Sequence, residues 1–252
     1  MLRLLSLETA TDQGAFALWS GEVTAAEIRV QSFKQFCCPA GQPHAETLLP
    51  ALRIALNELG WSLASIDAIV FDAGPGMFTG LRVSAALAQG LAVALNKPVI
   101  PVCSLVVLAE AAYQAMGATT VLSLLDARMN QIYAAGWTKE GLDWQAAFEP
   151  CLVGPDNLDY LPAMSKPLAA AGTGIKEYPA AADWLAQQGI VDSAVGYPSA
   201  DALARLGAVR FHAGCFTDPA EAIPVYVRDR VALTTAERAA GELIGFELLF
   251  LG

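Results

Sequence analysis

Two similar stretches of sequence constrain what this chain can fold into more than any other feature. The opening LLSLETATDQGAFALW is echoed by LSLLDARMNQIYAAGW, which aligns Glu8 with Asp126 and Trp19 with Trp137. Each stretch reads as an apolar strand that ends in a carboxylate, then a polar turn, then a strand that ends in tryptophan. A chance match is the alternative, but we interpret the echo as an internal duplication. It predicts two related lobes that face each other across a cleft.

The intervening sequence predicts strands and helices in alternation. Apolar runs at residues 3–9, 15–19 and 23–30 predict a three-stranded meander, with its second turn at Ser20-Gly21. A helix is predicted after Pro43 and ends at Gly60. A buried strand at 66–71, a helix at 79–96 and a strand at 99–102 follow, which gives the order βββαβαβ. Farther on we predict a strand at 167–171, a helix at 175–188, a helix capped by Ser199 and a capping box at 234–237. The apolar segment 246–251 needs a partner surface.

Charge and cysteine content exclude several classes of protein. The chain has 25 acidic and 15 basic residues, a net charge of −10, and its basic residues are scattered, which argues against a stand-alone nucleic-acid binder. Five cysteines without a C-x-x-C motif indicate reduced thiols. The longest uncharged apolar stretches fall short of the roughly 20 residues that span a bilayer. Glu8 and Asp12 interrupt any signal-peptide core. We therefore expect a soluble, cytoplasmic protein without membrane contact.

The glycine-rich segment GPGMFTGLR, residues 74–82, lies between a predicted strand and a predicted helix. Backbone N–H groups at such a junction, together with a helix N-terminus, favour a bound anion, so Gly74, Gly76, Thr79 and Gly80 are candidate ligand-binding residues. The segment is neither a Walker A loop nor a dinucleotide fingerprint. An equally supported alternative is structural: the glycines permit an unusual turn and Thr79 caps the helix.

Glu8 and Asp126 are the candidate acidic pair. Carboxylates at strand ends that face a cleft can hold Mg²⁺ through water. The alternative, which we favour, is that each accepts hydrogen bonds from its adjoining turn. No Ser/His/Asp elbow, H-E-x-x-H or kinase motif accompanies them. We therefore assign no catalytic residue, no metal ligand and no cofactor.

Two helical stretches, residues 45–59 and 80–96, predict a protein interface. The second is apolar nearly all round and rich in alanine and glycine, which permit close approach of another helix. Packing within the chain is the alternative explanation. The residues that we select for contact with a partner lie along both stretches: His44, Leu48, Leu52, Leu56, Val83, Ala86, Leu87 and Gly90.

Four segments, LLSLETAT, QPHAETLLP, GPGMFTGLR and PVYVRDRVA, together resemble the bacterial TsaB (YeaZ) family. The glycine-rich string is the most specific, and the similarity is densest over residues 1–108. The resemblance implies an actin-like (ASKHA) α/β fold of two ribonuclease-H-like βββαβα lobes with mixed sheets. We expect the lobes to span residues 1–104 and 105–252, with the partner-binding helices in the first.

The same resemblance implies a non-catalytic scaffold for N6-threonylcarbamoyladenosine formation next to the tRNA anticodon. In that system the paralogue TsaD transfers the threonylcarbamoyl group, and TsaE supplies an ATPase. The resemblance implies a heterodimer with TsaD, contact with TsaE through that complex, and only indirect contact with tRNA. A homodimer is the state considered for the free protein.

Departures from the catalytic paralogue support this interpretation. The positions of its metal-binding H-x-x-x-H fall on Ser104 and Leu108, which cannot replace imidazole ligands. Glu8 stands where the family usually has Asp, and Met77 where it usually has Ser.

The alternative function is an independent ASKHA-type ATPase or phosphotransferase that uses Glu8, Asp126 and the loops 74–80 and 172–174. A metallopeptidase is disfavoured by the missing histidines.

Overall fold

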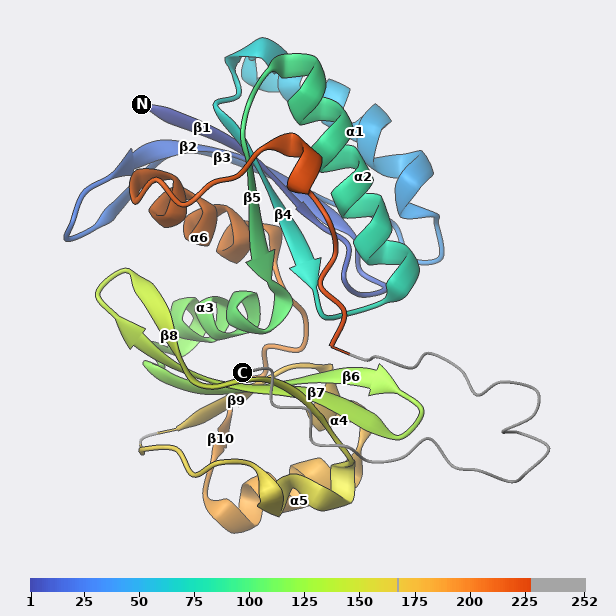
Figure 1. The fold of residues 1–252 in the computed structure, drawn as a ribbon, viewed down its shortest axis with the longest axis vertical. Helices are drawn as coiled ribbons and strands as arrows, with labels where there is room; N and C mark the ends of the chain where they lie inside the picture. The colour runs from blue at the N-terminus through green and yellow to red at the C-terminus, as the bar shows by residue number, and fades with distance from the viewer. Residues whose placement is uncertain (167, 228–252) are drawn as a thin grey trace.

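The computed structural model describes residues 1–166 and 168–227. The predicted capping box at 234–237 and the apolar segment 246–251 lie outside the described residues. Figure 1 shows two sheets stacked with helices above, between and below them. The echo predicted two related lobes, and each of the two sheets belongs to one of them.

The first sheet has the strand order β3-β2-β1-β4-β5. Its strands are β1 (Leu2–Glu8), β2 (Ala15–Val23), β3 (Ile28–Cys37), β4 (Ala68–Gly74) and β5 (Val99–Cys103). Strands β1 to β3 form an antiparallel meander, and β4 and β5 run parallel to β1. All seven residues of β4 are buried, as expected for a strand that is covered on both faces.

The prediction for the third strand was wrong. Ser20-Gly21 is not the turn but a bulge inside β2, where a Cβ on Gly21 would lie 2.3 Å from the carbonyl oxygen of Arg29. The turn follows at residues 24–27, where the Thr24 hydroxyl accepts hydrogen bonds from the N–H groups of Ala26 and Glu27. The Ser20-Gly21 pair therefore indicates a site where β3 approaches β2 closely, and not a chain reversal.

Helices α1 (His44–Leu59) and α2 (Phe78–Leu95) cover the outer face of this sheet (Figure 1). The Gly60 stop of α1 is confirmed: Gly60 adopts φ 65° and closes the helix. By length and composition α2 is apolar enough to cross a membrane, but it packs along β4 as a helix of this lobe.

The second sheet repeats the topology of the first. It consists of β6 (Thr120–Arg128), β7 (Gln131–Glu140), β8 (Asp143–Val153), β9 (Ala169–Ala171) and β10 (Val191–Asp192). Its order β8-β7-β6-β9-β10 matches β3-β2-β1-β4-β5 strand for strand, so the predicted pair of mixed sheets is confirmed. The pairing differs by one residue: Glu8 faces Ala15, but Asp126 faces Ile132. The tight turn at 128–130, with three residues at positive φ, replaces a longer turn in the first lobe.

Two short helices, α4 (Thr173–Glu177) and α5 (Pro179–Gln188), stand where one helix was predicted at 175–188. The break lies at Tyr178-Pro179, because proline has no N–H to continue the ladder and instead begins α5. Three 3₁₀ turns, η1 (Leu63–Ser65), η2 (Pro155–Tyr160) and η3 (Pro219–Glu221), complete the described elements.

Two inner helices lie between the sheets and contact each other: α3 (Ser104–Met116) and α6 (Ala200–His212). Helix α3 follows the first sheet but packs on β6 of the second, whereas α6 follows the second sheet but packs on β1 and β2. The largest hydrophobic cluster surrounds them and joins both sheets. Ser199 caps α6 as predicted, its hydroxyl accepting from Ala202 N. The lobe boundary at 104/105 remains a prediction. Helix α3 begins at Ser104, and α6 lies in the second part of the chain but packs on the first sheet.

Candidate functional site

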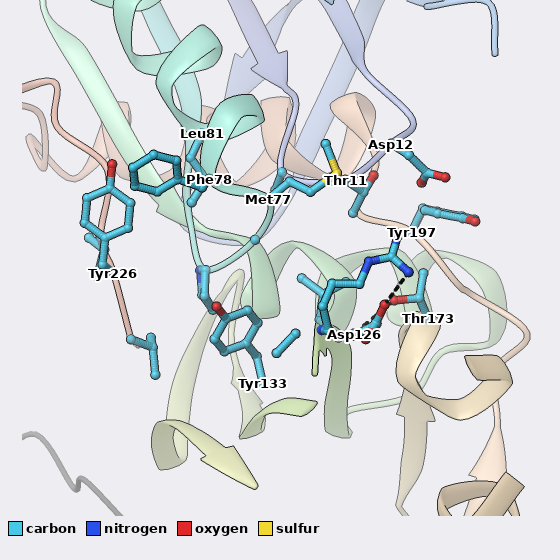
Figure 2. Close-up of a pocket in the computed structure, with 18 of the residues that line it drawn as sticks. Thr11, Asp12, Met77, Phe78, Leu81, Asp126, Tyr133, Thr173, Tyr197 and Tyr226 are labelled. Carbon is cyan, nitrogen blue, oxygen red and sulfur yellow. Dashed lines mark hydrogen bonds and ion pairs between the residues drawn. The ribbon is translucent and has the colours of Figure 1, made fainter. Parts of the chain in front are cut away.

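A cavity of about 220 Å³ lies where the two lobes meet. Both hairpin turns and the loops after β4 and β9 contribute to its wall. Figure 2 shows Thr11, Asp12 and Met77 on one side, and Asp126, Tyr133 and Thr173 on the other. The duplicated segments therefore converge on one cleft, although they are far apart in the sequence.

Backbone groups of the glycine loop form hydrogen bonds with the β1–β2 turn of the same chain. Met77 N donates to Ala10 O over 2.7 Å, and the Thr9 hydroxyl donates to Gly80 O over 2.6 Å. A Cβ on Gly76 would lie 2.4 Å from Ala10 O, and one on Gly80 only 1.8 Å from Thr9 O. These two glycines are needed because the loop packs directly against the β1–β2 turn. The structural interpretation of the loop accounts for them without a ligand.

The start of α2 differs from the prediction. Its N-cap is Met77, which offers no side-chain hydrogen bond, and Thr79 lies exposed within the first turn. The predicted cap at Thr79 is therefore wrong. Gly74 adopts φ 107°, a conformation that favours glycine, and its N–H donates to Asp72 Oδ1 over 2.8 Å.

Glu8 does not face the cavity. Its side chain is fully buried, and Oε1 accepts a hydrogen bond from Ala10 N over 2.7 Å. Burial is the largest cause that raises the pKa of Glu8 well above its ordinary value, followed by the nearby charge of Asp72. Asp72 was not among the predicted site residues, although a lone carboxylate inside an apolar strand was a signal for it.

Asp126 borders the cavity, but both of its carboxylate oxygens already interact with other groups of the protein. Its Oδ1 accepts from Arg128 N over 2.8 Å and from the Tyr178 hydroxyl over 2.7 Å, and its Oδ2 pairs with the Arg128 guanidinium at 3.0 Å. Burial, and then the bond to Asp126, raises the pKa of Tyr178 to about 12, so the phenol keeps its proton as a donor. Asp126 thus organises its own turn, which is the alternative that the sequence analysis favoured.

The described residues that line the cavity include more acidic than basic side chains. Asp12, Asp126 and Glu177 oppose one guanidinium, that of Arg128. Among residues 1–166 and 168–227, no three His, Cys, Asp or Glu side chains gather as a metal site. Ser104 and Leu108, the positions onto which the resemblance places metal histidines, have structural contacts: the Ser104 hydroxyl donates to Asp72, and Leu108 is buried in the core.

The residues selected for partner contact divide into two groups. Leu48, Leu52 and Leu56 point into the core of the first lobe and are at most 7% exposed, so their side chains are not available to a partner. Ala86 and Gly90 are exposed on α2, and Val83 and Leu87 are half-buried against the same core.

His44 is engaged within the chain. Its Nε2 accepts a hydrogen bond from Gly14 N over 3.1 Å, and the ring would meet any Cβ placed on Gly14. His44 therefore fixes the start of α1 to the β1–β2 turn. This contact argues for a structural role.

Comparison with known proteins links the chain to one tRNA-modification family. The family model of TsaD, tRNA N6-adenosine threonylcarbamoyltransferase, matches residues 39–213. The Escherichia coli tRNA threonylcarbamoyladenosine biosynthesis protein TsaB is 31% identical over 239 residues, which cover 92% of this chain and 96% of that protein. A Haemophilus influenzae protein of the same description is 37% identical over 140 residues, 55% of each chain.

Solved structures agree with the sequence comparison. YeaZ from Pseudomonas aeruginosa superposes with a TM-score of 0.76 at 29% identity, covering 90% of this chain and all of that one. Two mixed sheets of matching order, with paired turns around a cleft, define an actin-like (ASKHA) α/β protein. Within that class, the chain belongs to the TsaB (YeaZ) family.

Proposed function

We propose that this protein is a non-catalytic subunit required to form N6-threonylcarbamoyladenosine in tRNA, and that it binds and supports a TsaD-type transferase. Family membership supports the pathway. The observation that carries the non-catalytic role is the state of the two strand-end carboxylates: Glu8 and Asp126 both accept hydrogen bonds from their own turns. Contact with tRNA and with a TsaE-type ATPase then runs through the transferase, in the cytoplasm.

The exposed face of α1 and α2 is the surface that we assign to the transferase. Ala86, Gly90 and Val93 lie exposed along α2, and Val93 is 64% exposed. Leu49 and Ile54 add exposed apolar side chains on α1. The small side chains permit close approach of a partner helix, and the larger ones supply apolar area to bury. The same face could pair two copies when the transferase is absent.

Replacing Ala86 with arginine should abolish transferase binding without unfolding the protein. The side chain is exposed, so the change places a charge on the proposed interface and not in the core. We expect affinity to fall by at least about 100-fold, equivalent to about 3 kcal/mol. Calorimetric titration with TsaD and reconstituted tRNA modification measure the effect. Ala186→Arg, an exposed change on α5 of the second lobe and away from the proposed interface, is the comparison for added charge alone.

An unaltered affinity in the Ala86 variant would show that another face binds the transferase. The half-buried Leu87 is a poorer choice, because a charge there also disturbs the core of the first lobe. Light scattering of the free protein at several concentrations tests whether the same variant changes self-association.

An independent ATPase or phosphotransferase is the second candidate, favoured by the cavity between the lobes. Steady hydrolysis of ATP by the purified protein, lost in Asp126→Asn, would support it. Full tRNA modification in cells that lack the protein would contradict the scaffold proposal.

A further inference from the structure

Two buried carboxyl groups meet beneath the glycine loop. Glu8 ends β1 and Asp72 lies near the end of β4, and both side chains are fully excluded from solvent. One oxygen of each carboxyl group accepts hydrogen bonds from the protein. Glu8 Oε1 accepts from Ala10 N, and Asp72 Oδ1 accepts from Gly74 N over 2.8 Å and from the Ser104 hydroxyl over 2.5 Å.

The second oxygen of each group lacks a donor. Glu8 Oε2 and Asp72 Oδ2 are buried and receive no hydrogen bond from any described residue. Leu7 of β1 is paired with Phe71 of β4, so Glu8 and Asp72, one residue farther along each parallel strand, are neighbours across the two strands. Two ionised carboxylates cannot satisfy each other, because both only accept hydrogen bonds and both are negative. One proton between them supplies the missing donor and removes the repulsion.

We propose that Glu8 and Asp72 share one proton at neutral pH and that this carboxyl pair joins β1, β4 and the start of α3 beneath the glycine loop. The protonated Glu8 donates to Asp72, which remains the acceptor for Gly74 and Ser104. Loss of the proton leaves two like charges as neighbours in a dry site. The loop that leads from β4 into α2 then loses its anchor.

Within residues 1–166 and 168–227, no basic side chain forms an ion pair with either carboxyl group. Cys103 on β5 is a titratable neighbour of Asp72, and burial raises the pKa of its thiol to about 11, so it is neutral. Arg210 of α6 donates instead to Pro101 O over 2.7 Å. From helix α2, the Ser84 hydroxyl donates a hydrogen bond to Asp72 O.

The pair makes stability depend on pH in a defined direction. Burial raises the pKa of Asp72 to about 7, and the pKa of Glu8 is raised well above its ordinary value. Above the ordinary carboxyl range the folded state therefore holds more protons than the unfolded state. Because stability falls with pH wherever the folded state binds more protons, the pair destabilises the fold progressively through about pH 7 and above.

Urea unfolding of wild type, Glu8→Gln and Asp72→Asn, from about pH 6 to about pH 9, tests the proposal. An amide at either position supplies the shared hydrogen permanently, since its NH₂ group donates to the remaining carboxylate. We expect the folding constant of wild type to fall by at least about tenfold relative to either variant over this range. Asp126→Asn should follow wild type, because Asp126 contacts a guanidinium and a phenol, not a second carboxyl.

A direct measurement on the unaltered protein complements the variants. Infrared spectroscopy of the wild type near neutral pH should show a protonated carboxyl band that disappears on alkalinisation. Equal pH dependence in all four proteins, or absence of that band, would overturn the shared proton. Magnesium that restores wild-type stability near pH 9, without affecting Glu8→Gln, would also overturn it and assign a cation to the pair.

Discussion

Replacing Glu110 with alanine is expected to lower the free energy of unfolding by about 3–5 kcal/mol, because it leaves a buried ammonium group without its counter-ion. Glu110 lies on α3 and is 4% exposed. Its Oε2 accepts from Lys139 Nζ of β7 over 2.8 Å and from Trp144 Nε1 of β8 over 2.9 Å. The Lys139 side chain is 7% exposed and its ammonium lies over the rings of Tyr113 and Trp144.

Thermal or urea unfolding of the Glu110→Ala variant measures this loss. The matched control is Glu110→Ala combined with Lys139→Met, which removes both charges. We expect the double variant to be more stable than the single one, since no buried charge is then unpaired. A single variant as stable as wild type would show that the pair contributes little to holding the β7–β8 hairpin on α3.

Replacing Gly80 with alanine is expected to cost about 3 kcal/mol, because the new Cβ would lie 1.8 Å from the backbone oxygen of Thr9. A backbone oxygen in a hydrogen-bonded turn cannot move aside as a flexible side chain can. Accommodation requires the β1–β2 turn and α2 to separate. The bonds from Met77 N to Ala10 O and from the Thr9 hydroxyl to Gly80 O would be lost with it.

Gly90→Ala is the control within the same helix. A Cβ at Gly90 meets nothing within 4 Å, and alanine is the better helix former, so this variant should gain about 0.5–1 kcal/mol. Urea unfolding of both variants gives the comparison. Equal effects at Gly80 and Gly90 would mean that the loop does not pack tightly against the turn.

Local patterns predicted the elements well where both faces of a strand or one face of a helix are buried. The β1 and β4 strands, the end of α1 at Gly60 and the Ser199 cap follow from residues within a few positions of each other. The Ser20-Gly21 turn and the Thr79 cap were wrong, because glycine and threonine there meet a neighbouring strand or solvent. Local sequence does not encode such neighbours.

The candidate site was only partly predictable, for the same reason. The echo located the turns and loops that line the cavity. It did not reveal that Glu8 turns away from the cavity toward Asp72, or that Leu48 and Leu52 face inward. The sequence pattern of a carboxylate at a strand end is the same whether its side chain faces a cleft or another carboxyl group.

The sequence alone determined the repeated strand–turn–strand segment and the family, because alternating apolar residues and a distinctive loop string are properties of neighbouring positions. Only the tertiary structure decided which helix covers which sheet and which charges are buried together. Helices α3 and α6 each leave the sheet that precedes them in the chain and pack against the other. That choice depends on the complementary shapes of surfaces that are distant in sequence, such as Gly207 against Val70, and one-dimensional patterns do not contain it.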